Sequence, residues 1–404
     1  MKWKKVGCIV LSLAVIAGIV AISGCAQYPS GTITPTPTTH ATPEKWTKTL
    51  GGGDTEMGYS AQQTSDSGYI VVGYTESATG KKDVYLIKID AYGDEVWEKT
   101  FGEKDYYDVG DSVQQTSDGG YIVAGRKSWY GAGSADVYLI KVDVNGSKVW
   151  EKTFGGREYH AKNSVQQTSD GGYIIAGERS SDVCLIKTDA NGSKVWEKTF
   201  GEPSPDKVNS VQQTSDDGYI IAGATTPFAG GAGAHDVYLI KTDVNGSEVW
   251  EKTFGGGNAD EGASVQQTSD GGYVIAGMTY SYGSGKSDVY LIKTDSNGNK
   301  VWEKTFGGSG EDVGTSIRQT SDGGYIVVGW TDSYGAGKDD VYLIKTDTSG
   351  NKVWEKTFGG SGEDDWGRSV QQTSDGGYII AGVTFSYGSS GDIYLIKTDA
   401  NGNI

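Results

Sequence analysis

A segment of about 50 residues recurs seven times along this chain of 404 residues, and it constrains the fold more than any other feature. Each copy opens with a tryptophan in a stretch such as WEKTFGG and continues through SVQQT, SDGG, YIVAG, a loop, DVYLIK and a turn such as DVNGS. The opening tryptophans are Trp46, Trp97, Trp150, Trp196, Trp250, Trp302 and Trp354. Repetition at this period indicates units that must stack, because one unit cannot bury its apolar face alone.

Each repeat predicts four strands, named here A (SVQQT), B (YIVAG), C (DVYLIK) and D (KVWEKTF). The Asp-Gly and Asn-Gly pairs in the A–B and C–D links signal tight hairpins, where glycine or asparagine accepts a positive φ. Strands B and C are nearly continuous apolar runs, which indicates burial on both faces of a sheet. Four-stranded sheets stacked around an axis form a β-propeller, so we expect an all-β, seven-bladed β-propeller.

The two ends of the repeat array complement each other. The repeated region, residues 46–404, starts with a D strand in KWTKTL and stops after a C strand in DIYLIKTDANGNI. The last repeat therefore lacks a D strand of its own, and the N-terminal strand can supply it. The sequence predicts a ring closed in this way, which removes the exposed sheet edges of an open array.

The residues before the repeats are typical of a targeting segment and a linker. Residues 1–24 begin with the basic MKWKK and continue with an apolar run, as a secretory signal does. Ile22-Ser23-Gly24-Cys25 resembles the lipobox of prokaryotic lipoproteins, which implies cleavage before Cys25 and lipidation of its thiol. The alternative is an uncleaved membrane anchor. Residues 25–45 are rich in Thr and Pro and predict an extended linker, so the repeats are expected outside the cytoplasm and tethered to a membrane.

Charge and cysteine content exclude some classes of partner and of framework. The chain has 52 acidic and 35 basic residues, a net charge of −17, which disfavours nucleic acid as a partner. Cys8 lies in the signal and Cys25 in the lipobox, so Cys184 alone remains and no disulfide framework can form within one chain. We expect a monomer whose stability comes from packing and closure.

Loop lengths separate the two faces of the expected disc. The A–B and C–D turns keep a constant length, whereas the B–C loops range from 4 to 12 residues. The B–C loops and D–A links share one face, named here the variable face; the other is the constant face. Variation on a fixed scaffold is typical of a binding face. The repeated Ser-Tyr-Gly aromatics of the B–C loops have a structural interpretation, in which they plug the gaps between adjacent loops. Trp129 in a B–C loop and Trp366 in a D–A link break this pattern and suggest a platform for a sugar or a protein partner.

The third repeat departs from the others in charge. Its B–C loop is the shortest, and its candidate ligand-binding residues are Arg157, Tyr159, His160, Lys162 and Arg179. With Arg126 and Lys127 nearby, they predict a basic notch for an anionic sugar or an acidic peptide. Drift in a solvated loop is the alternative interpretation.

The repeated polar residues have both a structural and a functional interpretation. The acids four residues before the serine of strand A are Glu56, Asp108, Asp206, Asp260, Asp312 and Asp365. They suggest a ring that binds Ca²⁺, yet sevenfold repetition favours caps for the backbone of each link. The glutamines of strand A are candidates for lining the channel or for satisfying strand edges, and Arg318 replaces one of them and would put a charge at the channel wall. Asp118 in QQTSDGGY is interpreted as a turn residue that bonds its own backbone.

The TDANG…W element is similar to the tryptophan-docking element of quinoprotein-type propellers, although its Asp-to-Trp spacing is one residue shorter. The resemblance implies the fold but no cofactor, because quinoprotein dehydrogenases have paired cysteines that this chain lacks. Three scattered histidines give no catalytic set, so we expect a non-catalytic binding or scaffold module for protein or polysaccharide. In plan it resembles lipoprotein propellers that hold partners in envelope assembly. A glycosidase-like enzyme using carboxylates of the variable face, and a structural cell-surface or adhesion protein, remain alternatives.

Overall fold

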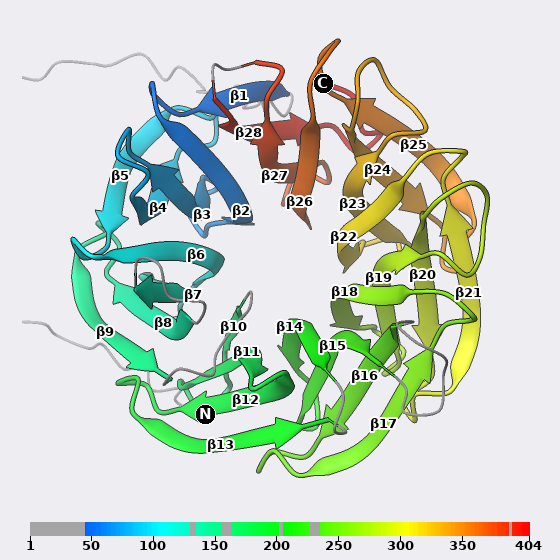
Figure 1. Ribbon diagram of the computed structural model, residues 1–404, viewed down its shortest axis with the longest axis horizontal. Coiled ribbons are helices and arrows are strands. Elements are labelled where there is room, and N and C mark those ends of the chain that lie inside the picture. The colour runs from blue at the N-terminus through cyan, green and yellow to red at the C-terminus, as the bar shows by residue number, and fades with distance from the viewer. Residues whose placement is uncertain (1–44, 130–134, 156–162, 202–204, 227–234, 388–389) are drawn as a thin grey trace, which may run out of the picture. The chain divides into compact units, whose positions relative to one another are not determined.

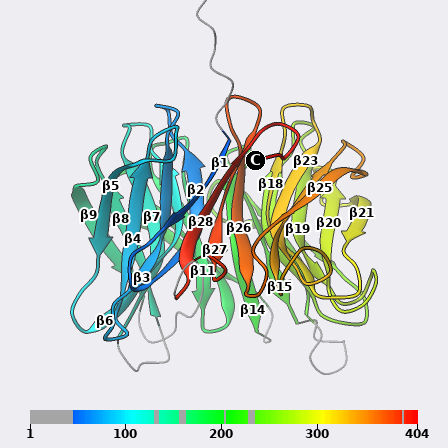
Figure 2. The same cartoon turned by 90° about the horizontal axis from the view of Figure 1, so that it is seen from above.

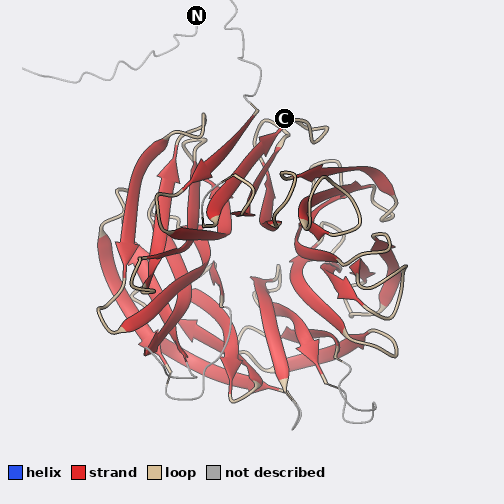
Figure 3. Ribbon diagram, turned by 45° about the horizontal axis from the view of Figure 1, so that its top comes forward, coloured by secondary structure: helices blue, strands red, loops and turns tan. Residues whose placement is uncertain are grey.

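The computed structural model describes residues 45–129, 135–155, 163–201, 205–226, 235–387 and 390–404. These ranges contain 28 strands in seven four-stranded antiparallel sheets, which surround a common axis as the blades of a propeller (Figure 1). No helix is present within them (Figure 3), and so none that could span a membrane. The all-β, seven-bladed fold is therefore confirmed. The predicted signal, Cys25 and the linker up to residue 44 lie outside the described residues.

In six blades the four strands follow one another in chain order from the axis outwards (Figure 1). Blade 1 consists of β2 (Thr55–Gln63), β3 (Tyr69–Glu76), β4 (Lys82–Ile89) and β5 (Glu95–Phe101). Blade 2 consists of β6 (Tyr106–Gln115), β7 (Tyr121–Trp129), β8 (Ala135–Val142) and β9 (Lys148–Phe154). Blade 3 consists of β10 (Ser164–Gln167), β11 (Tyr173–Arg179), β12 (Asp182–Thr188) and β13 (Lys194–Phe200).

The second half of the ring repeats this order. Blade 4 consists of β14 (Asp206–Gln213), β15 (Tyr219–Thr225), β16 (Asp236–Thr242) and β17 (Glu248–Phe254). Blade 5 consists of β18 (Asp260–Gln267), β19 (Tyr273–Thr279), β20 (Asp288–Thr294) and β21 (Lys300–Phe306). Blade 6 consists of β22 (Asp312–Gln319), β23 (Tyr325–Thr331), β24 (Asp340–Thr346) and β25 (Lys352–Phe358).

Blade 7 is built from both ends of the chain, as predicted. It contains β26 (Asp365–Gln372), β27 (Tyr378–Thr384), β28 (Asp392–Thr398) and the N-terminal strand β1 (Trp46–Leu50). β1 pairs antiparallel with β28, from Trp46 opposite Lys397 to Leu50 opposite Ile393. The pairing covers the edge of β28 that would otherwise be open, so closure of the ring by the N-terminal strand is confirmed.

The hydrophobic core is divided into seven clusters, each between two neighbouring blades. In the first cluster, Ile70 and Leu86 of blade 1 pack against Val123 and Ile140 of blade 2. The same arrangement recurs around the ring, including the junction between blades 7 and 1. Strands B and C face a neighbouring blade on each side, which explains why their sequences are apolar almost without interruption.

Each repeated tryptophan docks onto the next blade. Trp97 of blade 1 meets Tyr121 of blade 2 edge-on, with ring centroids 5.9 Å apart, and all seven Trp–Tyr pairs have centroids 5.8–5.9 Å apart. The turn glycine Gly146 also lies against Trp97, so that a Cβ there would come within 2.9 Å of the indole, and its φ of +77° is a conformation that favours glycine. The tryptophan is thus a connector between blades.

The QQTSDGGY motif is a turn, as predicted. Gly119 has a φ of +85°, and Asp118 Oδ1 accepts a hydrogen bond of 3.0 Å from the backbone N–H of Gly120. Sequence reasoning missed its second role, because the buried Lys141 of strand C forms an ion pair of 3.0 Å with Asp118. Burial raises the pKa of Asp118, but hydrogen bonds from Thr116, Lys141 and Gly120 outweigh this effect and hold that pKa at about 2. The Lys–Asp pair recurs in every blade.

The strands extend further than the sequence indicated, which moves several residues out of loops. A shift of register between Gly110 and Ser112 forms a bulge, so that β6 continues back to Tyr106. Asp108 therefore lies in a strand, and so do Trp366 in β26 and Trp129, the last residue of β7. The predictions that placed Trp366 in a D–A link and Trp129 in a B–C loop are wrong.

Candidate functional site

The strands run between two faces of the disc (Figure 2). Strands A begin and strands B end at the variable face, whereas strands D begin at the constant face. The described chain begins on the constant face, where Lys45 lies 3.7 Å from the carboxylate of Asp399 in the last turn. The candidate site residues considered below lie on the variable face and in the central channel.

Trp129 forms an exposed aromatic shelf on blade 2. Its side chain is 56% exposed, and its ring meets Tyr106 edge-on with centroids 5.2 Å apart. Lys127 Nζ lies 4.8 Å from the centroid of Tyr106 and forms an ion pair of 2.6 Å with Glu103. These contacts hold the supporting side chains in place, and more than half of the Trp129 surface is exposed. Trp129, Tyr106 and Lys127 are called the Trp129 shelf below.

The repeated Ser-Tyr-Gly aromatics of the B–C loops serve the fold. The hydroxyl of Tyr282 donates a hydrogen bond of 2.6 Å to the carbonyl of Gly255, and its ring lies 5.8 Å from that of Tyr290. Tyr334 and Tyr387 make the equivalent contacts in blades 6 and 7. These tyrosines close the gaps between loops and links, in agreement with the structural interpretation.

Trp366 is held more firmly than Trp129. It is half-buried, and its Nε1–H donates a hydrogen bond of 2.9 Å to the carboxylate of Asp339. Phe385 lies edge-on at 5.6 Å, and the guanidinium of Arg368 lies 5.1 Å from the indole. Trp366 therefore supports the inner strand of blade 7 and the position of Arg368.

The described cations of the predicted basic notch are paired with acids. Arg179 forms an ion pair of 2.6 Å with Glu197. In five other blades the equivalent glutamate accepts a hydrogen bond from a strand C tyrosine. In blade 3 the buried Cys184 stands at that tyrosine position, and Arg179 binds the glutamate in place of the tyrosine. Arg126 pairs with Asp111 at 2.9 Å, and Lys127 with Glu103. Four notch candidates lie outside the described residues: Arg157, Tyr159, His160 and Lys162.

The six repeated acids at the start of strand A are buried beneath the variable face. Asp260, Asp312 and Asp365 each accept a hydrogen bond of 2.8–2.9 Å from the N–H of a glycine in their own link. Glu56 and Asp108 accept equivalent bonds of 3.2 and 3.0 Å, and Asp206 is buried at the same position. In the described ranges no group of three or more His, Cys, Asp and Glu side chains is placed to hold a metal ion. Binding of Ca²⁺ by this ring stays a prediction.

One acid of this ring has a strongly shifted pKa. Burial raises the pKa of Asp108 to about 6, and the negative charges of Asp83 and Glu103 act in the same direction. The hydrogen bond from Glu103 N–H and the charge of Lys127 act against it. The carboxylates of Asp83 and Asp108 both lie close to Gly102, and Asp83 is partly exposed and forms an ion pair of 2.8 Å with Lys81.

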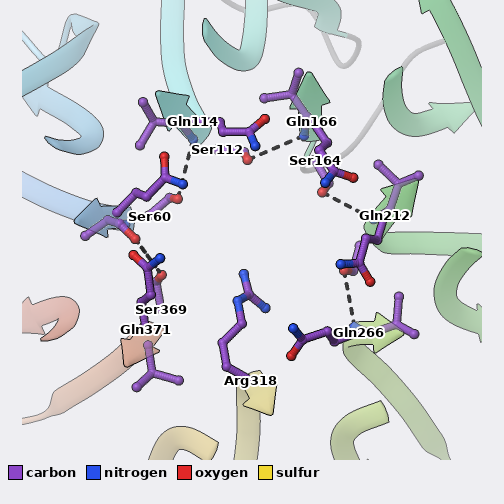
Figure 4. A pocket seen from close by; sticks show the side chains of 18 residues that line it. Ser60, Ser112, Gln114, Ser164, Gln166, Gln212, Gln266, Arg318, Ser369 and Gln371 are labelled. Atoms are coloured by element: carbon purple, nitrogen blue, oxygen red, sulfur yellow. Dashed lines mark hydrogen bonds between the residues drawn. The ribbon is translucent and has the colours of Figure 1, made fainter. Parts of the chain in front are cut away.

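A belt of serine and glutamine side chains lines the central channel (Figure 4). Each strand A serine Oγ accepts a hydrogen bond of 3.2–3.4 Å from a backbone N–H of the next blade. The first glutamine of each QQ pair adds a second bond, in which its Oε1 accepts from the next blade's backbone at 2.6–2.7 Å. The glutamines are Gln62, Gln114, Gln166, Gln212, Gln266 and Gln371. The belt thus joins neighbouring blades at the axis.

Comparisons with known proteins agree with this geometry. A family model described as a β-propeller domain of unknown function (DUF5122) matches residues 373–404. No curated protein matches the chain. Among solved structures, the chain is similar to the Pan2 WD40 domain of Neurospora crassa, with a TM-score of 0.53, 11% identity, and coverage of 87% of this chain and 92% of that one.

Two further similar solved structures each contain a bound partner or ligand. One is Drosophila Plexin A in complex with Semaphorin 1b, with a TM-score of 0.53, 8% identity and coverage of 87% and 86%. The other is an ulvan lyase of polysaccharide lyase family PL25 bound to -[GlcA(1-4)Rha3S]-, with a TM-score of 0.51, 12% identity and coverage of 88% and 97%. At these identities the likeness shows the fold alone. The chain is a seven-bladed β-propeller whose last repeat matches a β-propeller domain of unknown function.

Proposed function

We propose that this chain is a membrane-tethered, extracytoplasmic and non-catalytic module that binds a polysaccharide or a protein on its variable face. The observation that carries the proposal is the Trp129 shelf. Trp129 is the tryptophan with the largest exposure in the described part of the chain, and Tyr106 packs edge-on against its ring. An open, preformed indole face stacks on a sugar ring or fills a partner's pocket with little loss of conformational entropy.

The place where the chain joins the propeller supports this choice of face. β1 begins on the constant face, at Lys45, which is paired with Asp399. The chain that precedes β1 therefore joins the propeller on the constant face, opposite the face that carries the Trp129 shelf.

Binding is tested with a glycan array and purified residues 45–404. We expect the wild-type propeller to bind a polysaccharide class and Trp129→Ala to lose most of that signal. Loss of a central aromatic anchor costs about 2 kcal/mol or more, a reduction in affinity of roughly thirtyfold. A protein ligand is tested by the same pair of variants if no glycan binds. Equal binding by Trp129→Ala and the wild type would contradict the proposal.

A carbohydrate-active enzyme is the second candidate, and Glu178 is the observation that favours it. Burial raises the pKa of Glu178 to about 7, and the negative charges of Glu261 and Asp206 add to this effect. A carboxylic acid that keeps its proton near neutral pH is what a general acid requires. Turnover of any polysaccharide by the wild type and its loss in Glu178→Gln would replace the binding proposal with this one.

A further inference from the structure

The central channel contains a cavity of about 220 Å³ at the level of the serine and glutamine belt. The residues that line it are serine, glutamine, valine, alanine and a single arginine, and none of them is acidic. This composition is notable in a chain with a net charge of −17. The lining of the cavity therefore carries a positive charge, although the molecule as a whole is acidic.

The belt bonds give the glutamines a fixed polarity. A backbone N–H can only donate, so the side-chain atom that it meets must be Oε1. Gln62, for example, accepts from Gln115 N–H at 2.6 Å, and Gln371 accepts from Gln63 N–H at 2.7 Å. The acceptor end of each amide is thus used between blades. The Nε2 donors of the six belt glutamines remain for whatever occupies the channel.

Arg318 breaks the belt in blade 6. It stands where six blades have the glutamine, and its side chain extends toward the middle of the ring (Figure 4). Its guanidinium donates one hydrogen bond of 2.7 Å to the carbonyl of Ile317. Across the described ranges no carboxylate forms an ion pair with it. The substitution gives up a bond between blades and places an unneutralised cation among amide donors.

A second cavity of about 90 Å³ leads from this site toward the variable face. It shares Arg318 and several belt serines with the first cavity, and it is also lined by Asn209 and Arg368. Arg368 stacks on Trp366, and its Nε is buried without a hydrogen-bond partner. Asp111 is the acid in this lining, and Arg126 neutralises it. A second guanidinium therefore lies on the path into the channel.

We propose that the channel binds a small oxyanion, a carboxylate, phosphate or sulfate group, with Arg318 as its charged ligand and the Nε2 groups of the belt glutamines as neutral donors. A planar guanidinium presents two parallel N–H donors that match two oxygens of such a group. The neutral donors oppose the repulsion that the acidic protein exerts on an anion. This site is separate from the Trp129 shelf and does not depend on the function proposed for it.

Isothermal titration at constant ionic strength tests the site, with inorganic phosphate, sulfate and citrate as probes and chloride as the background anion. We expect at least one probe to bind the wild type, and Arg318→Gln to weaken its affinity by about tenfold to a hundredfold, since a charge-assisted contact is lost. Arg368→Gln should weaken it less. The control is Lys338→Gln, which removes an exposed cation paired with Glu363 on the variable face and should bind like the wild type.

Arg318→Gln also carries its own folding control. The variant restores the residue found in six blades, so its melting temperature should equal or exceed that of the wild type. No heat with any probe, or equal affinities for the wild type and Arg318→Gln, would overturn the proposal. A glucuronate-ended oligosaccharide distinguishes two sources of the anion. Dependence on both Arg318 and Trp129 identifies the acidic end of a ligand on the variable face, and dependence on Arg318 alone identifies a free anion.

Discussion

The side chain of Trp46 packs the closing strand β1 against the first blade. Its ring lies edge-on to Tyr69 with centroids 5.9 Å apart, and its Nε1–H donates a hydrogen bond of 3.3 Å to the carbonyl of Ala91. The turn glycine Gly93 lies against the indole. Trp46→Ala removes all three contacts and leaves the backbone pairing with β28 in place. The substitution therefore tests how much the docking of β1 contributes to the closed ring.

The size of the effect follows from these contacts. Replacing a fully buried tryptophan with alanine costs about 3–5 kcal/mol, so the half-buried Trp46 should cost about 2–3 kcal/mol. The lost hydrogen bond adds about 1 kcal/mol. The entropy of unfolding is about 2.1 cal/mol/K per residue, and roughly 360 residues are folded. A loss of about 3 kcal/mol then lowers the melting temperature by about 4 °C.

Differential scanning calorimetry measures this shift, and Trp250→Ala provides the matched control. Trp250 makes the same contact with Tyr273, with centroids 5.8 Å apart, at a junction inside the continuous chain. Both variants should lose about 4 °C, but only Trp46→Ala should speed amide hydrogen exchange in β1 and β28. An unchanged melting temperature for Trp46→Ala, beside a loss of several degrees for Trp250→Ala, would refute the closure argument. Deletion of residues 45–50 should lower the melting temperature further than Trp46→Ala.

Three further predictions concern charge and packing. Asp118→Asn should cost about 1 kcal/mol at pH 7, a value reduced by solvent screening of its pair with Lys141. The pKa of Asp118 is lower in the folded than in the unfolded state, so this stabilisation is present above about pH 4 and is lost as the pH falls through about 2. Urea unfolding of the wild type and of Asp118→Asn at pH 7 and pH 2 measures the loss. The pKa of Asp108 is instead raised to about 6, so the stability that its protonated carboxyl contributes is lost as the pH rises from about 4 through 6. Asp108→Asn should therefore raise the melting temperature at pH 7.5 but not at pH 4. Stabilisation of the wild type by Ca²⁺ that is absent in Asp108→Asn would favour the metal hypothesis. In blade 3, Arg179→Ala should lower the melting temperature of the wild type. It should not lower that of Cys184→Tyr, because the new tyrosine can donate a hydrogen bond to Glu197. Equal effects in both backgrounds would contradict the idea that Arg179 replaces the missing tyrosine.

Much of the fold could be predicted because local patterns within each repeat indicate its strands and turns. Apolar runs such as YIVAG and DVYLIK identify strands that are buried on both sides. The D strand at Trp46 and the missing D strand after Thr398 together predict closure of the ring. The turn role of Asp118 follows from the glycine behind it. Each of these features depends on neighbours in sequence or on the exact repetition of one unit.

The remaining features depend on contacts between segments that are distant in sequence. The start of strand A was placed too late, because the bulge at Gly110 interrupts the pattern without ending the strand. The pairing of Arg179 with Glu197 cannot be predicted from local sequence, since it depends on the loss of a tyrosine at Cys184. The donor polarity of the channel was missed as well. It depends on bonds between glutamines of adjacent blades, and the single signal in the sequence was Arg318.

The central claim is that the variable face, and the Trp129 shelf in particular, binds the ligand. Tyr92 provides a control of equal exposure, because it is 56% exposed, as Trp129 is, but lies in a turn of the constant face. The most direct measurement is the affinity of Trp129→Ala and Tyr92→Ala for the first polysaccharide or protein that binds the wild type. The account predicts a loss of roughly thirtyfold for Trp129→Ala and wild-type affinity for Tyr92→Ala. Wild-type affinity for Trp129→Ala together with a loss for Tyr92→Ala would place the ligand on the opposite face and contradict the account.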